Sequence, residues 1–375
     1  MKKNDLFYQV ALSLIDGIGG KNARLLFMYC GSAQNIFQKW TTNQFHQTIP
    51  GIGLKTAQKI EDSKKEVFKK ATEIIEKCEE YNVKILSLFE KDTEFPDVLR
   101  NYEDSPLLMY YKGNATLNDK KIIGIVGTRQ ATDYGRDAVE KILTELAPYK
   151  PLIISGLAYG IDIAAHKTAL KLGLETIGVM ASGLDIIYPA EHKKIAFEML
   201  ENGGLLTENP FGTTPDARRF PARNRIIAGM SDALVVVEAQ IKGGAVITAD
   251  IANDYNKDVF AVPGSIKSEA SLGCNLLIQQ NKAMLVNSGA DIIQFLEWDN
   301  AQKINKQIHL DLDTLDLTEI EKKILKHLKE KGQTQIDVLA YQIQKPVQEL
   351  NALLLNLELL NLIKSIPGQK YSLKN

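Results

Sequence analysis

The sequence has few cysteines, few histidines and no long hydrophobic run. Its 375 residues include 3 cysteines and 5 histidines, and Cys30, Cys78 and Cys274 lie far apart along the chain. An odd number of scattered cysteines argues against a disulfide framework and indicates a reducing, cytoplasmic environment. No stretch of apolar residues is long enough for a membrane-spanning helix, so we expect no membrane association.

The chain also lacks an excess of charge of either sign. Its 45 lysines and arginines nearly balance 46 acidic residues, which gives a formal net charge of −1 at pH 7. The protein as a whole would therefore not attract a polyanion, and any such attraction must come from a local groove. A hydrophobic content of 45% and a charged content of 24% are typical of a globular protein, here long enough for two or three domains.

Several motifs for cofactors and catalysis are missing. Neither the glycine-rich dinucleotide fingerprint nor the P-loop occurs. No Cys/His cluster has metal-ligand spacing, and no carboxylate pair stands out as acid and base. Asp162 and His166 are one helical turn apart, but we expect the first to cap a helix and the second to pack behind it. The sequence predicts no cofactor, no metal and no catalytic residue.

Apolar segments of strand length alternate with segments of helical periodicity between residues 84 and 296. Strands that are apolar on both faces and separated by helices predict a doubly wound, Rossmann-like parallel sheet. The expected strands are 121–127, 151–156, 175–180, 204–208, 232–239, 257–263 and 283–286. Two further short extended segments, within 84–115, precede them.

The first 82 residues have a helical pattern that contains an internal repeat. LIDGIGGKNARLL (14–26) and TIPGIGLKTAQKI (48–60) superpose at a shift of 34 residues. Glycines in the turn and a small residue one turn later are typical of a helix-hairpin-helix, which predicts an all-α domain over 1–82. Such turns either bind phosphates at a helix N-terminus or only dock two helices, and both interpretations stay open.

A polar linker over 297–317 and a winged-helix domain over 318–375 are expected at the C-terminal end. Thr318 is a candidate N-cap with Glu321 three residues later. Three helical segments and a short hairpin follow, in the order of a winged helix-turn-helix. The leucine-rich segment 345–360 is too apolar for a helix that reads a DNA groove, so we expect it to serve packing, self-association or a protein partner.

Small, polar or cationic residues follow the predicted strands. Because ligands of open parallel sheets bind beyond the carboxyl ends of the strands, these residues are candidates for one site. Glycines at strand-to-helix turns expose backbone N–H groups that favour anions. The candidates are Gly127, Thr128, Arg129, Ser155, Gly156, Lys242 and Gly243.

Four arginines surround an aromatic residue in the stretch 218–225. Arginine suits phosphate, and an aromatic side chain beside cations is a stacking platform for unpaired bases. The cluster consists of Arg218, Arg219, Phe220, Arg223 and Arg225. The alternative is that Phe220 anchors a loop in the core while the arginines pair with nearby acids, and charge alone does not decide between the two.

The order of these motifs resembles the DNA-processing protein A family (DprA, also called Smf). The resemblance covers about residues 84–296 and is carried by GTR (127–129), SGLAYGIDIAAHKTAL (155–170), GLDIIYPAEH (183–192), FPARNRIIAGMSDALVVVEA (220–239), ITADIA (247–252), VFAVPGS (259–265) and GCNLLI (273–278). It implies a non-enzymatic protein that binds and protects incoming single-stranded DNA. It also implies a homodimer that loads the RecA recombinase during natural transformation.

The resemblance also implies a set of DNA-binding residues. Arg129 would clamp a phosphate, Phe220, Arg223 and Arg225 would line the groove, and Lys242 would lie in a loop beside it. The remaining implied residues are Gly127, Thr128, Ser155, Gly156, Arg219, Gly243 and Asn275. The chain has Gly243, Gly244 and Ala245 where family members often carry S-G-S, so two hydroxyl contacts would be lost.

Two rival functions remain open. A hydrolase of nucleoside monophosphates would use the loop KGGAVITAD, with Asp250 as its carboxylate. A regulator that binds duplex DNA would act through the winged helix, with the sheet as a sensor.

Overall fold

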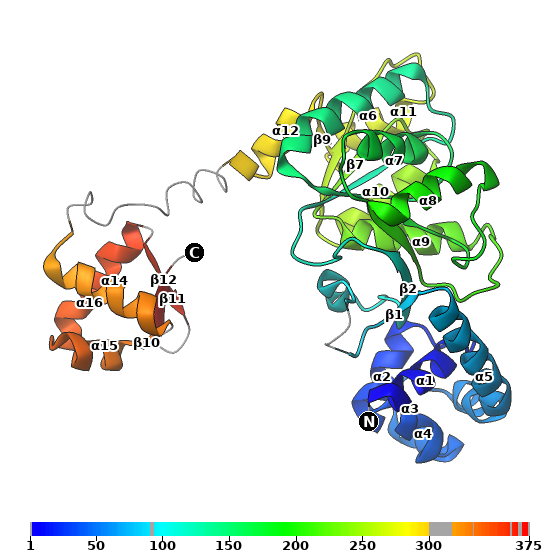
Figure 1. Ribbon diagram of the computed structural model, residues 1–375, viewed down its shortest axis with the longest axis horizontal. Coiled ribbons are helices and arrows are strands. Elements are labelled where there is room, and N and C mark those ends of the chain that lie inside the picture. The colour runs from blue at the N-terminus through cyan, green and yellow to red at the C-terminus, as the bar shows by residue number, and fades with distance from the viewer. Residues whose placement is uncertain are drawn as a thin grey trace. The chain divides into compact units, whose positions relative to one another are not determined.

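The computed structural model describes residues 2–90, 94–299, 317–332, 334–360, 362–366 and 370–373. The chain forms two compact units, Met1–Leu296 and Glu297–Asn375 (Figure 1). The first holds a group of helices and a large sheet, and the second holds a small winged helix. Among the described residues, no helix combines the length and the apolar character needed to cross a membrane.

The sheet of the first unit has nine strands within the described residues, in the order β1-β2-β6-β5-β4-β3-β7-β8-β9. The strands are β1 (Lys84–Ser87), β2 (Leu108–Gly113), β3 (Ile122–Gly127), β4 (Leu152–Ser155), β5 (Thr176–Val179), β6 (Gly203–Thr207), β7 (Ala233–Val237), β8 (Asp258–Ala261) and β9 (Met284–Leu285). The strands from β3 to β9 pair in parallel, which confirms the predicted fold class. The pair β1–β2 adds an antiparallel edge that the pattern did not predict.

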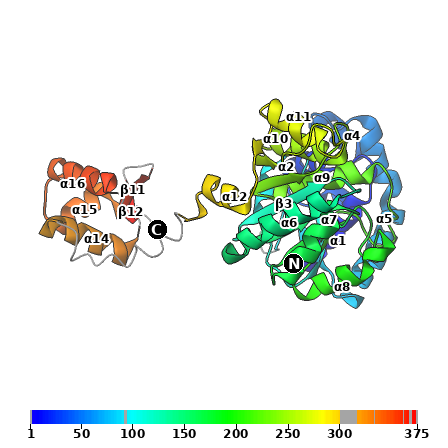
Figure 2. The same ribbon diagram turned by 90° about the horizontal axis from the view of Figure 1, so that it is seen from above.

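Helices cover both faces of this sheet (Figure 2). One face carries α6 (Asp133–Leu146), α7 (Ile161–Lys171), α8 (Lys193–Glu201) and α12 (Gly289–Phe295); the other carries α9 (Arg219–Met230), α10 (Gly244–Asp254) and α11 (Leu272–Gln279). The described residues also form 3-10 turns: η1 (Asp97–Asn101) lies between β1 and β2, η2 (Ala147–Tyr149) follows α6, and η3 (Ala190–His192) precedes α8. After β6 the chain returns to the middle of the sheet, so β3 and β7 form the switch point at which such folds bind ligands.

Burial on both faces explains the apolar strands. Ile154, Val235 and Val236 are completely buried. Each such side chain contributes about 1.5–3 kcal/mol relative to an exposed one. The central strands therefore read as continuous apolar runs because helices cover both faces.

The N-terminal helices are α1 (Lys2–Ser13), α2 (Gly20–Cys30), α3 (Ala33–Gln38), α4 (Thr42–Thr48) and α5 (Leu54–Glu80). The two repeat turns share one backbone geometry, with φ of 90° at Gly17 and 87° at Gly51. Gly19 and Gly53 are the extended N-caps of the following helices. A helix-hairpin-helix repeat requires this equivalence, and the motif itself stays a prediction.

The two repeat turns have different surroundings. A Cβ atom at Gly20 would lie 1.9 Å from the carbonyl oxygen of Ser105, whereas the equivalent residue of the second copy, Leu54, is 53% exposed. Arg24, in the first copy, donates to the carbonyls of Arg100 and Tyr102 at 2.8 and 3.0 Å. The first copy therefore docks on the loop before β2, and the second copy stays open.

The helices and the sheet share a hydrophobic cluster. Leu107, Leu108 and Tyr110, at β2, pack with side chains of α1 and α5 such as Leu12 and Ile74. The predicted boundary at residue 82 falls between α5 and β1, but the cluster crosses it. The division of this unit into domains stays a prediction.

The second unit consists of α14 (Glu319–Lys331), β10 (Thr334–Gln335), α15 (Ile336–Ile343), α16 (Val347–Leu359), β11 (Ile363–Ile366) and β12 (Lys370–Leu373). Thr318 and Glu321 form the predicted capping box. The short strand β10, which pairs with β12, was not predicted. The expected linker 297–317 falls mostly outside the described residues.

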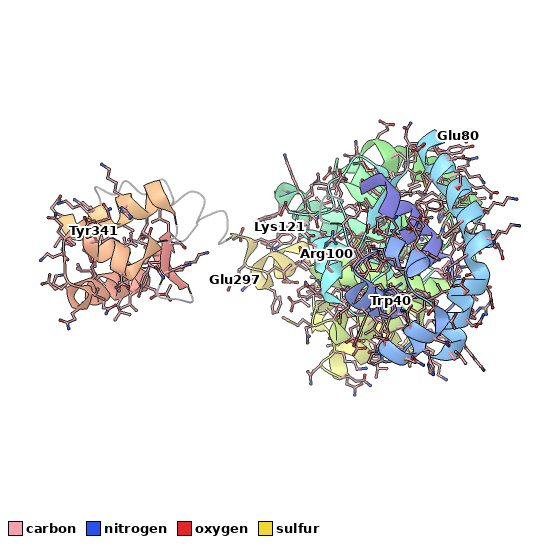
Figure 3. The ribbon with its side chains drawn as sticks, turned by 90° about the horizontal axis from the view of Figure 1, so that it is seen from below. Trp40, Glu80, Arg100, Lys121, Glu297 and Tyr341 are labelled. Carbon is pink, nitrogen blue, oxygen red and sulfur yellow. The ribbon has the colours of Figure 1, made fainter. Side chains whose placement is uncertain are left out.

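The leucines of α16 divide between the core and the surface. Leu350, Leu354 and Leu357 are buried, whereas Leu359 is 78% exposed. Tyr341 of α15 is also on the surface of this unit, 81% exposed (Figure 3). Packing thus accounts for only part of the leucine content, and the expected protein contact stays a prediction.

Candidate nucleic-acid interface

A groove of about 410 Å³ lies at the carboxyl ends of β3 and β7, the switch point of the sheet. Six of the residues expected at the site line it: Gly127, Thr128, Arg129, Phe220, Arg223 and Gly243. They come from the turn after β3, from α9 and from the start of α10. The doubly wound topology therefore brings together residues that are more than 100 positions apart in the sequence.

The N-terminus of α10 forms one end of this groove. Gly243 is its extended N-cap, and no side chain caps the helix. A Cβ atom at Gly244 would meet nothing within 4 Å, so the backbone is open to a ligand there. Free N–H groups at the positive end of a helix favour an anion such as a phosphate.

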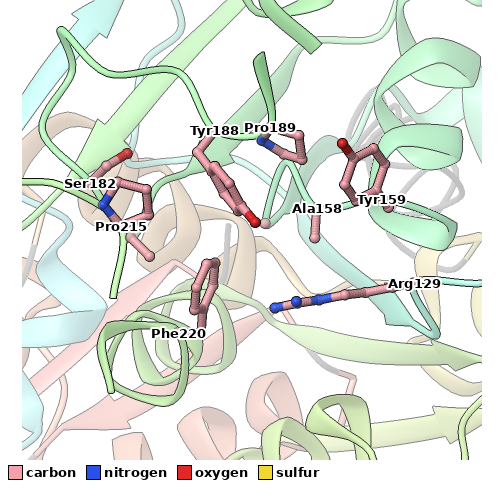
Figure 4. A pocket seen from close by; sticks show the side chains of 10 residues that line it. Arg129, Ala158, Tyr159, Ser182, Tyr188, Pro189, Pro215 and Phe220 are labelled. Atoms are coloured by element: carbon pink, nitrogen blue, oxygen red, sulfur yellow. The ribbon is translucent and has the colours of Figure 1, made fainter. Parts of the chain in front are cut away.

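Arg129 and Phe220 form the wall of the groove. The guanidinium of Arg129 lies over the ring of Phe220, 4.9 Å from its centroid (Figure 4). Among the described residues, no hydrogen bond or ion pair of exposed Arg129 is found. Its charge and its donors are therefore available to a ligand, while stacking on Phe220 holds the guanidinium in place.

A narrow slot lies on the other side of this wall. Its volume is about 10 Å³, which is room for one water molecule. It is lined by Arg129, Gly156, Ala158, Tyr159, Ala181, Ser182, Tyr188, Pro189, Pro215 and Phe220 (Figure 4). Neither Tyr159 nor Tyr188 was expected at the site from the sequence, although both stand in the quoted motifs, in the loops that follow β4 and β5.

Arg223 is buried inside the wall. Its Nη1 donates to the carbonyl oxygens of Gly156 and Val179, at the ends of β4 and β5. Burial lowers the pKa of Arg223 to about 10, against the opposing effect of Asp162. Burial also raises the pKa of the Asp162 carboxyl, against the effect of Arg223. The guanidinium thus braces the loops that shape the groove, and the expected direct contact with DNA stays a prediction.

The other clustered arginines have partners of their own. Arg225 donates to Glu208 and to the carbonyl of Asp104. Arg218 pairs with Asp216 at 3.1 Å. Arg219 donates to the carbonyl of Thr214 at 2.6 Å. The alternative that arginines pair with nearby acids is therefore confirmed for Arg218 and Arg225.

Six expected site residues do not line the groove: Arg219 and Arg225, described above, and Ser155, Gly156, Lys242 and Asn275. Ser155 is buried and donates to the carbonyl of Ile125 at 2.6 Å. Asn275 bonds to the backbone of Gly264 through both its amide nitrogen and its oxygen. Lys242 is exposed next to Gly243 but lies outside the lining residues. Gly156 lines the slot instead of the groove.

The groove offers little for a hydrolase. Asp250, the carboxylate of that rival, pairs with Lys282 at 2.7 Å and does not line the groove. Asp162 does line it but is buried beside Arg223. His166 bonds through Nδ1 to the Thr176 hydroxyl, and burial lowers its pKa to about 3. In the described part of the chain, no group of three His, Cys, Asp or Glu residues could hold a metal ion.

Fold and site together define a class: a doubly wound α/β protein with an anion-favouring groove at its switch point, followed by a winged helix. The family model of the DNA recombination-mediator protein A matches residues 86–297, and that of the DprA winged helix domain matches residues 311–369. The chain belongs to the DprA family.

Several relatives support this membership. Protein Smf of Synechocystis sp. is 31% identical over 99% of both chains. The DNA processing protein DprA of Streptococcus pneumoniae is 41% identical over 55% of this chain and 73% of its own length. The X-ray structure of DprA from Streptococcus pneumoniae has a TM-score of 0.65 at 31% identity, over 78% of this chain and 97% of its own.

A second solved structure is that of DNA processing protein A from Helicobacter pylori, which binds single-stranded DNA. Its TM-score is 0.52 at 30% identity, and the match covers 58% of this chain and 96% of that one.

Proposed function

We propose that this protein binds single-stranded DNA in the groove at the switch point, without cleaving it. The observation that carries the proposal is the exposed guanidinium of Arg129, stacked on Phe220 beside the open N-terminus of α10. A phosphate at this position would accept charge-assisted hydrogen bonds from the guanidinium of Arg129 and hydrogen bonds from the backbone N–H groups at the start of α10.

The aromatic side chain favours a single strand over a duplex. A ring can stack on a base only when that base is unpaired and turned out of its helix. The near-neutral net charge fits the same picture, because attraction is confined to one groove. Family membership and the DNA-binding relative from Helicobacter pylori add to this argument.

The biological role follows from the family resemblance. The protein would act in the cytoplasm, where it would protect incoming single-stranded DNA and load the RecA recombinase on it during natural transformation. Neither step requires a catalytic residue, which agrees with a groove whose carboxylate, Asp162, is buried beside Arg223.

The homodimer that the resemblance implies would form at the β9 edge of the sheet. Met284 and Leu285 of this edge strand are 45% and 48% exposed. Apolar side chains on an open strand edge favour pairing with another chain. Leu285→Lys should shift the protein to a monomer in sedimentation velocity, whereas Phe197→Lys, which changes a 55% exposed side chain of α8, should not.

A binding titration tests the proposed function. Fluorescence anisotropy with labelled oligo-dT and oligo-dA at two salt concentrations would give the affinity and its salt dependence. Arg129→Ala should weaken binding to both oligonucleotides about 10- to 100-fold, because one charge-assisted phosphate contact and its stacked ring are disturbed. Arg136→Ala is the matched control, since that arginine pairs with Asp133 on α6.

If Arg129→Ala and the unchanged protein bound the oligonucleotides with equal affinity, the groove would not be the DNA-binding site. Tight binding to duplex DNA with sequence preference would favour the winged-helix regulator. Release of free base from a nucleoside monophosphate would favour the hydrolase.

A further inference from the structure

We propose that Glu238 is a positioning residue for DNA binding: it holds the turn after β3 so that the guanidinium of Arg129 meets a phosphate in the groove. Glu238 does not line the groove and would not touch DNA itself. The inference rests on the proposed function, because Glu238 would act through Arg129.

Glu238 lies at the carboxyl end of β7, where the chain reaches the groove. It follows Val237, the last residue of β7, and Gln240, two residues later, lines the groove. Its side chain is buried, 2% exposed, and its backbone φ is 55°. A non-glycine residue with such a φ is uncommon, because its Cβ atom crowds the backbone. Strained residues of this kind gather at functional sites.

The turn that carries Arg129 is tied to Glu238 on both sides. Before Arg129, the N–H group of Thr128 donates to the carbonyl oxygen of Glu238 at 2.8 Å. After it, Thr132 donates to the Glu238 carboxylate from its N–H group at 2.9 Å and from its hydroxyl at 2.5 Å. One residue therefore fixes the start and the end of the segment from which the Arg129 side chain projects.

The first turn of α6 is shaped to receive this carboxylate. Thr132 is the N-cap of α6, so the carboxylate of Glu238 lies at the positive end of that helix, which favours a negative charge. A Cβ atom at Gly135 would lie 2.2 Å from Oε2 of Glu238. Glycine is a poorer helix former than alanine, and here its missing Cβ atom leaves room for the carboxylate.

Stability alone does not explain a carboxylate at this position. In the part of the chain that the structure describes, no lysine or arginine pairs with Glu238. Burial of such a charge costs free energy, so a neutral side chain would serve the fold better. A carboxylate adds two strong acceptors, which hold the N–H group and the hydroxyl of Thr132 together. A turn that is fixed in advance loses less conformational entropy when DNA binds.

Two variants of the full-length protein break this tie in different ways. Glu238→Gln keeps the size of the side chain but weakens its acceptors. Gly135→Ala keeps the carboxylate but displaces its flexible end. Each should weaken binding to labelled oligo-dT about 3- to 10-fold, the difference expected between a charged and a neutral hydrogen bond. Glu140→Gln, which removes an exposed carboxylate that pairs with Lys171, is the control and should bind normally.

The direction of the Glu238→Gln effect separates position from charge. The substitution removes a negative charge beside a groove that favours anions, so charge alone would strengthen binding. A loss of affinity therefore indicates that Glu238 acts by holding the turn. Tighter binding by Glu238→Gln would contradict the inference, and so would normal binding by both Glu238→Gln and Gly135→Ala.

A double-mutant cycle tests whether Glu238 acts through Arg129. In an Arg129→Ala background, Glu238→Gln should change the affinity for oligo-dT by less than about 1.5-fold, because the contact that it positions is already absent. Equal fold losses in both backgrounds would overturn the inference, since Glu238 would then support the fold in general. Thermal unfolding of each variant would show that it is folded.

Failure of the proposed function gives a different result. Arg129→Ala would then bind oligo-dT as well as the unchanged protein does. If Arg129→Ala weakens binding while Glu238→Gln and Gly135→Ala do not, the proposed function stands and the positioning role of Glu238 is wrong.

Discussion

The arginines near the groove share one chemistry but occupy different environments. Arg129 is exposed and free to meet a phosphate, while Arg223 is buried and bonds to two backbone carbonyls. Arg225 is held by Glu208. A guanidinium can clamp a ligand only if its own donors are not already used, so position decides function among chemically identical side chains.

Arg223→Ala should lower the free energy of unfolding by about 3–5 kcal/mol. The substitution would leave the buried carboxylate of Asp162 without its compensating charge, and it would remove the brace between β4 and β5. Urea denaturation followed by circular dichroism measures this. A variant with normal stability that no longer binds single-stranded DNA would instead identify Arg223 as a direct DNA contact.

His166 should make stability depend on pH in mildly acidic solution. Thr176 donates its hydroxyl to the carbonyl of Ile153 and so accepts from Nδ1 of His166, which leaves Nε2 buried without a partner. Burial lowers the pKa of His166 to about 3 in the folded state, from 6.5 in the unfolded chain. The unfolded state therefore takes up a proton first as the pH falls.

The free energy of unfolding should decrease by about 1.4 kcal/mol per pH unit between pH 6 and pH 4.5 through this group alone. His166→Asn should lack this pH-dependent component. The difference in the free energy of unfolding between His166→Asn and the unchanged protein should therefore become smaller as the pH falls. Urea titrations at four pH values give the slopes. Parallel pH profiles would show that His166 is protonated in the folded protein.

At the scale of elements, the two helical repeat turns show how one local geometry serves two purposes. The start of α2 packs closely against the carbonyl of Ser105, and only glycine fits at position 20 because any Cβ atom would overlap that carbonyl oxygen. The equivalent residue at the start of α5 is Leu54, which is 53% exposed. The first turn docks the helices on the loop before β2, and the second faces solvent.

Gly20→Ala should destabilise the protein by about 1–3 kcal/mol, although alanine is the better helix former, because its Cβ would overlap a backbone oxygen. Gly53→Ala, with open space and a φ of −73°, should change stability by less than about 1 kcal/mol. Denaturation midpoints compare the pair. Equal effects of the two substitutions would mean that α2 is not docked on Ser105.

At the scale of the whole molecule, the first unit and the second unit, which holds the winged helix, have separate hydrophobic cores. Leu339, Leu350 and Leu354 belong to a cluster that lies entirely within the second unit. The groove and the slot lie entirely within the first unit. Binding of single-stranded DNA should therefore not need the winged helix.

A chain that ends after residue 299 should bind oligo-dT within about threefold of the full-length protein. The slope of log Kd against log salt should also be the same, because the number of phosphates contacted is unchanged. Anisotropy titrations at four salt concentrations measure both quantities. A smaller slope in the shortened chain would mean that the winged helix also touches the phosphate backbone.

The periodic features of this protein could be predicted from the sequence alone. The seven parallel strands, the capping box at Thr318 and the GTR turn follow from local patterns: apolar runs, spacing and glycines. Such features depend on neighbours in the chain, so the residues themselves contain the information. The antiparallel edge strands β1 and β2 were visible only as extended segments, because pairing partners are distant in sequence.

The roles of individual side chains were decided by the tertiary structure. FPARNR shows two arginines beside an aromatic residue, but only the fold turns Arg223 inward to β4 and β5 and ties Arg225 to Glu208. Tyr159 and Tyr188 are 29 positions apart in the sequence (188 − 159), and only the switch point of the sheet brings them to the wall of Arg129 and Phe220. Local pattern determines which elements form, whereas burial and long-range packing determine which charges and rings remain free to meet a ligand.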